Sequence, residues 1–247
     1  MISYDTDLKI FSSSLINDDQ FFAGFSTRQL KDGAKVENIF SFLRENEIDF
    51  KNLVVLDQIH STNIEFIRPQ SNEDFLKIED TDGVITDQKN AVLAVRTADC
   101  LPIIFCDKKQ GLIGVSHQGW RGSLKQMVVK MVNEMIGAGA KKENIQVAIG
   151  PGIGQCCYDV DEDRYFQFLD ELEKYSDKIF KVIKGKRHLN LLLLNYLLLV
   201  DNGVKKENID YFPFCTYCDN SRFFSFRHGK INHRVDLEEM FSFIMIS

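Results

Sequence analysis

The sequence contains few of the residues that usually separate domains. Only four of its 247 residues are proline, and no Pro-, Gly- or Ser-rich stretch interrupts the chain. Linkers between domains are usually rich in such residues. With 44% hydrophobic residues, the chain can bury one large core. We therefore expect a single domain over residues 1–247.

A long hydrophobic run is also missing. The most apolar stretch, residues 189–200, is interrupted by Asn190 and Asn195, and it is shorter than the ~20 residues that span a bilayer. The first residues lack the cationic segment and apolar core of a secretory signal. These absences predict a soluble, cytoplasmic protein with no membrane partner.

The chain lacks an excess of positive charge, since its formal net charge is −6. A protein that binds nucleic acid usually presents a basic surface to the phosphate backbone. We therefore expect no nucleic-acid partner. Small molecules are the expected ligands, and the chain is expected to act as a monomer.

Six cysteines are present, and a reducing cytosol would leave them unpaired. Cys215 and Cys218 form a lone C-x-x-C, without the second pair of a zinc ribbon. The adjacent Cys156 and Cys157 are not expected to place both thiolates on one ion. We therefore expect Cys215 and Cys218 to be packed thiols, with redox or metal chemistry as the alternative. Cys106 is expected to be a small buried hydrophobe.

The pattern of apolar residues predicts a mixture of strands and helices. Runs of the strand type occur at 53–56, 83–86, 91–95, 103–106, 112–116 and 146–149. Helical patterns cover 36–46, 124–136, 161–172 and 187–200. Strands joined by short turns and mixed with helices indicate an α+β or mixed α/β fold.

Three side chains stand where apolar runs break. Cys100 and His117 come at breaks in the segment 94–122, and His60 follows another apolar run. Such groups can converge on one metal ion and leave a coordination position open, which distinguishes a catalytic zinc site from a closed structural one. The sequence therefore predicts an enzyme with His60, Cys100 and His117 as catalytic metal ligands.

Zinc is the expected metal, with copper as the alternative because its affinity for such donors is generally higher. Zinc would lower the pKa of its water toward ~7 and supply a nucleophile at neutral pH. We expect about one zinc per chain. Two other interpretations stay open: a metal-free pair in which His117 or His60 activates Cys100 as a nucleophile, and a metal store without turnover.

Three arginines are candidate phosphate ligands. Arg121 follows H-Q-G-W at a predicted helix start, where a guanidinium can hold phosphate through two hydrogen bonds. Arg28 in S-T-R and Arg227 in F-S-F-R complete the set. A solvated surface position is the alternative for each arginine. The glycine-rich turn 150–154 lacks a Walker lysine and is weak evidence for a nucleotide site.

Two aspartates and three phenylalanines have open roles. Asp99 precedes Cys100, and Asp82 lies in T-D-G; each either orients a neighbouring group or caps a turn. The phenylalanines are expected in a hydrophobic strand, with an aromatic wall for a purine as the alternative. They are Phe223, Phe224 and Phe226.

Seven motifs in order resemble the YfiH-like, or laccase-domain, family, whose members are labelled polyphenol oxidase, purine nucleoside phosphorylase or peptidoglycan editing factor. Two departures stand out: Gln118 replaces the usual Ala, and N-H-R at 232–234 replaces T-G-R. The motifs are F-S-T-R at 25–28, Q-I-H at 58–60, T-D-G at 81–83, T-A-D-C-L-P at 97–102, H-Q-G-W-R-G at 117–122, I-G-P-G-I-G-Q-C-C-Y-D-V at 149–160 and F-F-S-F-R at 223–227.

The resemblance implies an α+β catalytic domain with a layered helix/sheet/sheet/helix core and mixed β-sheets. It also implies phosphorolysis of adenosine, inosine and methylthioadenosine, with accompanying deamination of adenosine. Purine nucleosides and phosphate would then be the partners. The alternatives are a copper-dependent polyphenol oxidase and a cysteine-type hydrolase that edits peptidoglycan precursors. The oxidase is disfavoured because the sequence shows no second Cys/His cluster for a multicopper array.

Overall fold

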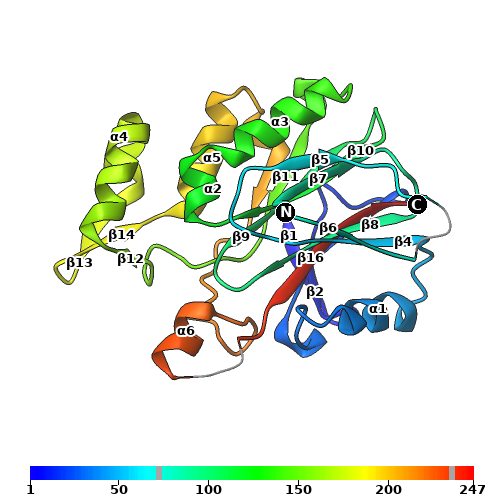
Figure 1. Cartoon of the computed structure of the whole chain (residues 1–247), viewed down its shortest axis with the longest axis horizontal. Helices are drawn as coiled ribbons and strands as arrows, with labels where there is room; N and C mark the ends of the chain where they lie inside the picture. The colour runs from blue at the N-terminus through cyan, green and yellow to red at the C-terminus, as the bar shows by residue number, and fades with distance from the viewer. Residues whose placement is uncertain (71–73, 234–236) are drawn as a thin grey trace.

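Two large β-sheets lie face to face in the computed structural model, and helices cover both outer faces (Figure 1). The structure describes residues 1–70, 74–233 and 237–247. The N-H-R departure at 232–234 ends on Arg234, which lies outside the described residues. None of the helices in the described part of the chain has the length and hydrophobicity of a membrane span.

The first sheet has seven strands in the order β1-β2-β3-β16-β8-β4-β6. β4 pairs in parallel with β8 and β6, and the other neighbours are antiparallel. The last strand of the chain, β16, therefore lies inside the sheet. The strands are β1 (Ile2–Asp5), β2 (Ile10–Ser13), β3 (Phe21–Ser26), β4 (Asn52–Leu56), β6 (Phe75–Ile78), β8 (Ala91–Thr97) and β16 (Met240–Ile246).

The second sheet has six strands in the order β15-β11-β9-β10-β7-β5. The outer pairs, β15 with β11 and β5 with β7, are parallel, and the central pairs are antiparallel. The predicted strands 83–86 and 146–149 match β7 and β11. The strands are β5 (Ile64–Phe66), β7 (Gly83–Thr86), β9 (Leu101–Asp107), β10 (Leu112–Gln118), β11 (Gln146–Ile149) and β15 (Ile209–Tyr211).

The central strands are buried on both faces. In β8, Leu93 points into the core between the sheets, whereas Val92 packs on the side of α1. In β9, Ile104 and Cys106 point into the same core, and Phe105 packs on the opposite face. Successive residues of a strand point to opposite faces, so these strands appear as continuous apolar runs. The expectation that Cys106 is a buried hydrophobe is confirmed.

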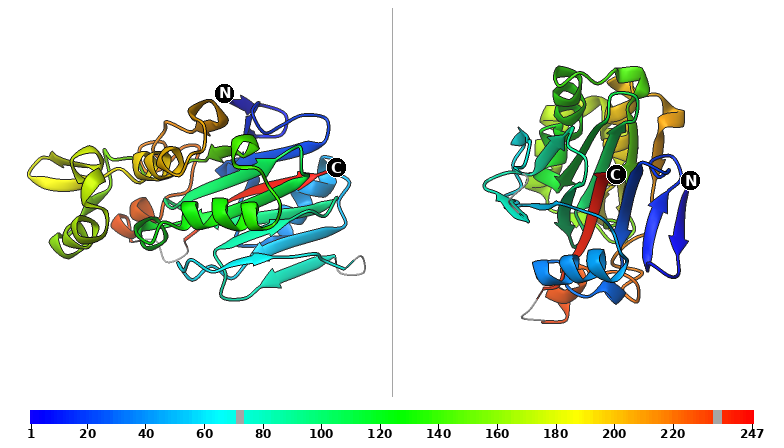
Figure 2. Two further views of the ribbon diagram at one scale, coloured as in Figure 1. Left: turned by 90° about the horizontal axis from the view of Figure 1, so that it is seen from above. Right: turned by 90° about the vertical axis from the view of Figure 1, so that its right-hand side faces the viewer.

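Helices close the two outer layers. α1 (Val36–Glu45) packs on the seven-stranded sheet through Ile39, Phe42 and Leu43. The six-stranded sheet is covered from the other side, as Figure 2 shows. The helix/sheet/sheet/helix layering and the α+β class are therefore confirmed. The covering helices are α2 (Trp120–Leu124), α3 (Met127–Gly137) and α5 (Leu191–Asp201).

A small third sheet extends beside these layers, at the left of Figure 1. Its strands lie in the order β12-β14-β13, with bounds β12 (Asp159–Val160), β13 (Phe180–Ile183) and β14 (Lys186–Leu189). α4 (Glu162–Ile179) belongs to this unit and contacts α5. Its N-terminus is capped by Asp161, which accepts a hydrogen bond from the backbone N–H of Arg164 at 2.8 Å.

Three helix predictions are wrong at their boundaries. The helix predicted over 161–172 continues to Ile179 as α4. The helix predicted over 187–200 begins at Leu191, because residues 186–189 form β14 and Asn190 caps α5 by accepting the Leu193 N–H at 2.9 Å. The helix predicted over 124–136 is split between α2 and α3, since Gln126 adopts a left-handed φ of 56°. The remaining helical segments are α6 (Phe226–Ile231) and short 3-10 turns at Arg28–Leu30, Lys142–Asn144 and Lys206–Asn208.

Candidate active site

The three predicted ligands come together from both large sheets. β9 and β10 are antiparallel, and their register pairs Gln118 with Leu101. Cys100, directly before β9, therefore lies beside the end of β10, where His117 stands. His60 arrives from the loop after β4, a strand of the other sheet. Residues far apart in the sequence thus meet at one place.

The spacing of these side chains fits a single divalent ion. His60, Cys100 and His117 each place one ligand atom within 4.8 Å of the others. The Sγ of Cys100 lies 3.9 Å from Nε2 of His60. A sulfur and a nitrogen bound to tetrahedral zinc would lie about 3.6 Å apart. Three protein ligands of this chemistry also leave one coordination position free for water or substrate.

Gly119 allows this close approach. A Cβ at this position would lie 2.8 Å from Cδ2 of His60 and 3.1 Å from the Sγ of Cys100. Any larger residue would therefore push two candidate ligands aside. The φ of Gly119 is −74°, a value open to every residue type. Glycine is therefore required here by the lack of space around the site and not by the backbone conformation.

Asp82 links the imidazole of His117 to the backbone of the His60 loop. Its carboxylate lies 2.7 Å from Nδ1 of His117. It also accepts the backbone N–H groups of Ile59, His60 and Ser61 at 3.2, 3.1 and 2.6 Å, which holds the left-handed backbone of His60 at a φ of 59°. A carboxylate behind a histidine fixes its ring and leaves the other nitrogen for a metal. Of its two open roles, Asp82 therefore has the orienting one.

The clustered groups shift the proton affinities of one another. Burial opposes ionisation of the Cys100 thiol, but the charge of His117 and hydrogen bonds from both imidazoles outweigh burial and lower the pKa of Cys100 to about 7. Burial also disfavours a charged His117, whereas the Cys100 thiolate and Asp82 raise the pKa of His117 to about 10. Without a metal, the site therefore favours a thiolate beside an imidazolium.

Asp99 holds the turn in front of Cys100. Its φ is 84°, a conformation that residues other than glycine rarely adopt. Its carboxylate accepts hydrogen bonds from the hydroxyl of Thr216 at 2.6 Å and from the backbone N–H of Arg227 at 2.7 Å. Asp99 thus ties the turn between β8 and β9 to two later segments, which is a turn-holding role.

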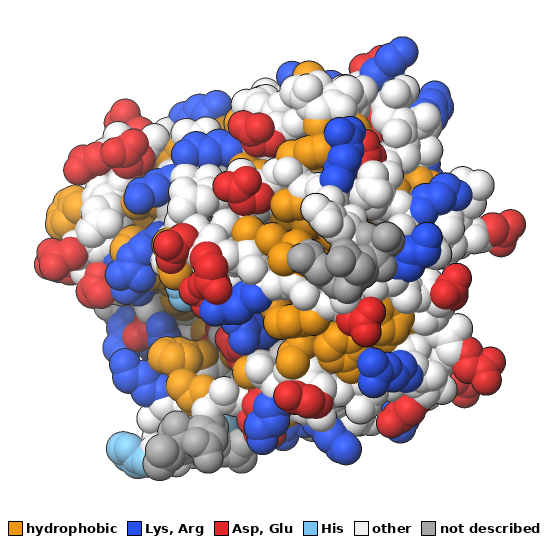
Figure 3. All heavy atoms as spheres, turned by 45° about the vertical axis from the view of Figure 1, so that its right-hand side comes forward, with side chains coloured by type: hydrophobic (Ala, Val, Ile, Leu, Met, Phe, Trp, Pro, Cys, Tyr) orange, Lys and Arg blue, Asp and Glu red, His pale blue; other side chains and the backbone are white. Residues whose placement is uncertain are grey.

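A cavity of about 590 Å³ opens over the three candidate ligands. This volume lies within the range of about 300–1,000 Å³ that small-molecule sites occupy. Figure 3 shows Lys and Arg side chains gathered around a hollow at the lower left of the view. The cations that line the cavity are Arg96, Arg121, Arg164, Arg227 and Lys230.

The arginines predicted from the sequence divide into two groups. Arg121 and Arg227 line the cavity. Arg28 does not, because it lines a separate small hollow, with its guanidinium 4.7 Å from the ring centre of Phe224. Within the described part of the chain, Arg121 makes no ion pair, and its guanidinium stacks 4.6 Å from the centre of the Trp120 ring. Arg121 is therefore available to an anion.

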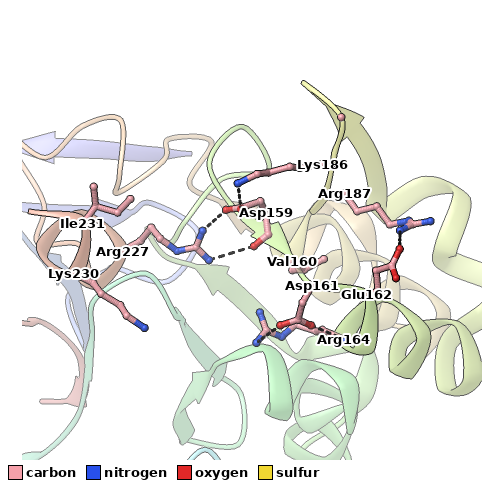
Figure 4. A pocket seen from close by; sticks show the side chains of 11 residues that line it. Asp159, Val160, Asp161, Glu162, Arg164, Lys186, Arg187, Arg227, Lys230 and Ile231 are labelled. Atoms are coloured by element: carbon pink, nitrogen blue, oxygen red, sulfur yellow. Dashed lines mark hydrogen bonds and ion pairs between the residues drawn. The ribbon is translucent and has the colours of Figure 1, made fainter.

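Sequence reasoning missed a further basic group at the mouth of this cavity. Arg164 lies on the first turn of α4, with its guanidinium 4.5 Å from the Trp120 ring centre. Arg164, Arg227 and Lys230 line both the cavity and an outer pocket of about 790 Å³. Figure 4 shows this outer pocket, in which Asp159 accepts from both Arg227 and Lys186. No local motif marked Arg164, because the third sheet brings it to the site.

The phenylalanines are divided between the core and the cavity. Phe223 and Phe224 are buried between the two large sheets, so their hydrophobic interpretation is confirmed. Phe226 is 47% exposed, lines the cavity and begins α6. The predicted strand is therefore wrong, and one of the three aromatic rings borders the candidate site.

Four cysteines depart from the sequence-based expectation. Cys156, Cys157, Cys215 and Cys218 place their Sγ atoms within 4.8 Å of one another. Adjacent side chains diverge in an extended chain, but residues 155–157 form a turn, closed by the Cys157 N–H donating to the Gly154 carbonyl at 3.0 Å. The expectation that Cys156 and Cys157 cannot face one ion is therefore wrong.

Comparisons with known proteins agree with this fold. Residues 23–247 match the family model described as multi-copper polyphenol oxidoreductase laccase. The chain is 33% identical over 191 residues to a protein named adenosine deaminase RL5, from an unknown prokaryotic organism, a match that covers 75% of this chain and 73% of that protein. It is also 33% identical over 189 residues to purine nucleoside phosphorylase YlmD of Bacillus subtilis (strain 168), covering 74% and 68%.

Solved structures show the same architecture over nearly the whole chain. YlmD from Geobacillus stearothermophilus has a TM-score of 0.85 at 25% identity and covers 99% of this chain and 98% of its own. The hypothetical protein YfiH of Bacillus licheniformis has a TM-score of 0.81 at 30% identity, with 92% and 93% covered. This chain therefore belongs to the YfiH-like, laccase-domain family.

Proposed function

We propose that the chain is a zinc-dependent purine nucleoside phosphorylase that acts on adenosine, inosine and methylthioadenosine and also deaminates adenosine. One observation carries this assignment: His60, Cys100 and His117 meet in a cavity whose lining also presents Arg121 and Arg164. A metal site beside anion-binding groups suits both reactions. The printed names of two relatives, an adenosine deaminase and a purine nucleoside phosphorylase, support the same pair of activities.

The metal would be held by His60, Cys100 and His117. Asp82 occupies Nδ1 of His117 and so leaves Nε2 as the nitrogen that can bind the ion. When bound, zinc supplies a Lewis acid and lowers the pKa of a water molecule. Copper is the alternative metal for the same donors.

The cavity offers separate surfaces for phosphate and for the nucleoside. Arg121 and Arg164 stack on Trp120 and present guanidinium groups, which bind phosphate through paired hydrogen bonds. Tyr158 and Phe226 provide aromatic surface for the base. In phosphorolysis the arginines hold phosphate for attack on the ribose carbon that carries the purine. That carbon gains a bond to a phosphate oxygen and loses its bond to the purine, which takes a proton.

Arg28 takes no part in this phosphate site, because it lines another hollow. Arg227 contributes charge to the cavity and is already paired with Asp159. In the same assignment, residues 1–247 act as one catalytic domain, since a single apolar core joins the two large sheets.

A copper-dependent polyphenol oxidase is the second candidate function, because the matching family model bears that description. A multicopper array needs further histidines close together. His188 donates its Nδ1–H to the Gln155 carbonyl at 2.8 Å, and His228 lies on α6. Within the described ranges, neither belongs to a Cys/His cluster. The available donors therefore favour the nucleoside activities.

A cysteine-type hydrolase is the third candidate, since the neighbouring imidazoles lower the pKa of Cys100 to about 7.

One experiment separates the three candidate functions. The protein is incubated with adenosine, with and without phosphate, and adenine, inosine, hypoxanthine and ribose 1-phosphate are separated. We expect adenine and ribose 1-phosphate only with phosphate, inosine in both reactions, and loss of both activities after chelation. Turnover that survives chelation would favour a Cys100 nucleophile, and oxygen-dependent phenol oxidation without nucleoside turnover would favour the oxidase.

Asp82→Asn should weaken metal binding at this site by about 10- to 100-fold, the usual effect of removing a carboxylate partner of a metal-bound histidine. Asn lacks the negative charge that orients His117 and holds the His60 loop. Competition with a chelator measures the affinity. Asp87→Asn is the matched control, because the half-buried Asp87 pairs with the exposed Arg68 and does not line the cavity. Equal affinities in the two variants would contradict the orienting role of Asp82.

A further inference from the structure

A second cluster of metal-binding side chains lies behind the candidate active site. Two segments supply it: the turn at Cys156 and Cys157, and the turn at Cys215 and Cys218. A β-bridge between Gly152 and Cys215 joins the two segments. The cluster therefore connects residues that are about sixty positions apart in the sequence.

The sulfur positions fit a tetrahedral ion more closely than disulfides. The Sγ of Cys218 lies 3.6 Å from that of Cys156 and 3.3 Å from that of Cys157. Four sulfurs around zinc, each at about 2.3 Å from the metal, would lie about 3.8 Å apart. A disulfide would require a separation of about 2.05 Å. Cys218 cannot bond to both partners, but one ion can contact all four thiols.

The backbone around the cluster is shaped for charged sulfur. The N–H of Gly154 donates to the Sγ of Cys215 at 3.1 Å, a contact that stabilises a thiolate. A Cβ at Gly154 would lie 2.9 Å from the Cβ of Cys215 and 3.2 Å from the Sγ of Cys156, so no side chain fits there.

We infer that Cys156, Cys157, Cys215 and Cys218 bind one zinc ion in a structural site, separate from the ion proposed at His60, Cys100 and His117. Four thiolates complete the tetrahedral shell and leave no position for substrate, which is typical of structural zinc. Each coordinated thiol releases its proton on binding. The protein then holds two zinc ions per chain, of which only one faces the cavity.

The position of this second site explains what it does. Ile153 and Tyr158 flank its first turn and line the cavity. Thr216 follows Cys215 and donates to Asp99, which holds the turn in front of Cys100. By clamping the two cysteine turns together, the ion fixes one wall of the cavity and the support of a candidate ligand.

Zinc stoichiometry tests this inference. Protein purified with a thiol reductant, supplied with zinc and freed of excess metal should hold two zinc ions per chain. Cys218→Ser should hold one and melt at a lower temperature. Because Cys218 is exposed, this change disturbs little packing. Cys218→His should keep two ions, because Cys₃His is also a common structural zinc set. Cys106→Ala, which alters a cysteine outside both clusters, should also keep two.

Two further variants separate this site from the proposed active-site ion. Cys100→Ala should hold one zinc, and the double variant Cys100→Ala/Cys218→Ser should hold none. With cobalt in place of zinc, the strong thiolate-to-cobalt absorption should persist in Cys100→Ala and largely disappear in Cys218→Ser. The structural site would be overturned if Cys218→Ser retained the full zinc content. It would also be overturned if the reduced protein were lighter by two protons, which indicates a disulfide. If the wild-type protein holds one zinc and Cys218→Ser holds none, the structural site is supported. The ion proposed at His60, Cys100 and His117 is then refuted.

Discussion

Cys100→Ala should remove the ion at the candidate active site and lower both phosphorolysis and deamination more than about 100-fold. Removal of even an outer partner of a metal ligand lowers affinity or activity by about 10- to 100-fold, and Cys100 is one of only three donors in this cluster. Loss of the thiolate also removes one of the two negatively charged neighbours of His117, the other being Asp82. Zinc content and the two initial rates on adenosine measure the effect.

Cys100→His provides the control for this prediction. Three histidines also form catalytic zinc sites, so this variant should keep more metal than Cys100→Ala and recover part of the activity. A nucleophilic role for Cys100 has the opposite consequence, because an imidazole cannot replace the thiol in a covalent step of that kind. Full metal content in Cys100→Ala, with unchanged affinity, would refute the assignment of Cys100 as a ligand.

Arg121→Lys should lower phosphate-dependent cleavage by about 10- to 150-fold, while deamination falls much less. Hydrogen bonds to charged groups contribute about 1.5–3 kcal/mol, and lysine retains the charge of arginine without its planar pair of donors. Deamination consumes water and needs no phosphate. Rates of adenine and inosine formation from adenosine, measured on the same preparation, give the comparison.

Arg44→Lys is the matched control, because Arg44 also stacks on an aromatic ring, 5.0 Å from the centre of Phe40, on the helix α1. It should leave both rates unchanged. If Arg121 only braces Trp120, Arg121→Lys should reduce both reactions equally and lower the melting temperature. That result would contradict a role of Arg121 in phosphate binding.

The strands of the two large sheets could be predicted largely because strands buried on both faces are mostly apolar, whereas the helix/sheet/sheet/helix layering was implied only by the family resemblance. β7 and β11 match their predicted bounds for this reason. The third sheet was missed, since the strand at 186–189 carries Lys186, Arg187 and His188 and resembles no buried run. The split between α2 and α3 was missed as well, because the helical period continues across Gln126 while its backbone does not.

At the site, the sequence pointed to candidate donors through their own chemistry but not to residues whose position is decided by tertiary contacts. The ligand role of the three donors stays a prediction. His60, Cys100 and His117 could be identified as donors, and the strand register brings them together. Arg164 could not be placed, because its position depends on how α4 packs. The convergence of the four cysteines was missed because it depends on a turn at residues 155–157. The sequence-based expectation for adjacent residues did not allow for this turn.

The position of β16 has a consequence for the order of folding. This strand lies between β3 and β8, so within the described residues the β1-β2-β3 segment joins the rest of the larger sheet only through residues 240–246. During synthesis, β1, β2 and β3 must wait for residues 240–246 before the sheet can close. Contacts so distant in sequence slow folding. Deletion of residues 240–246 should therefore split the larger sheet into two parts, although every candidate metal ligand would remain in the chain.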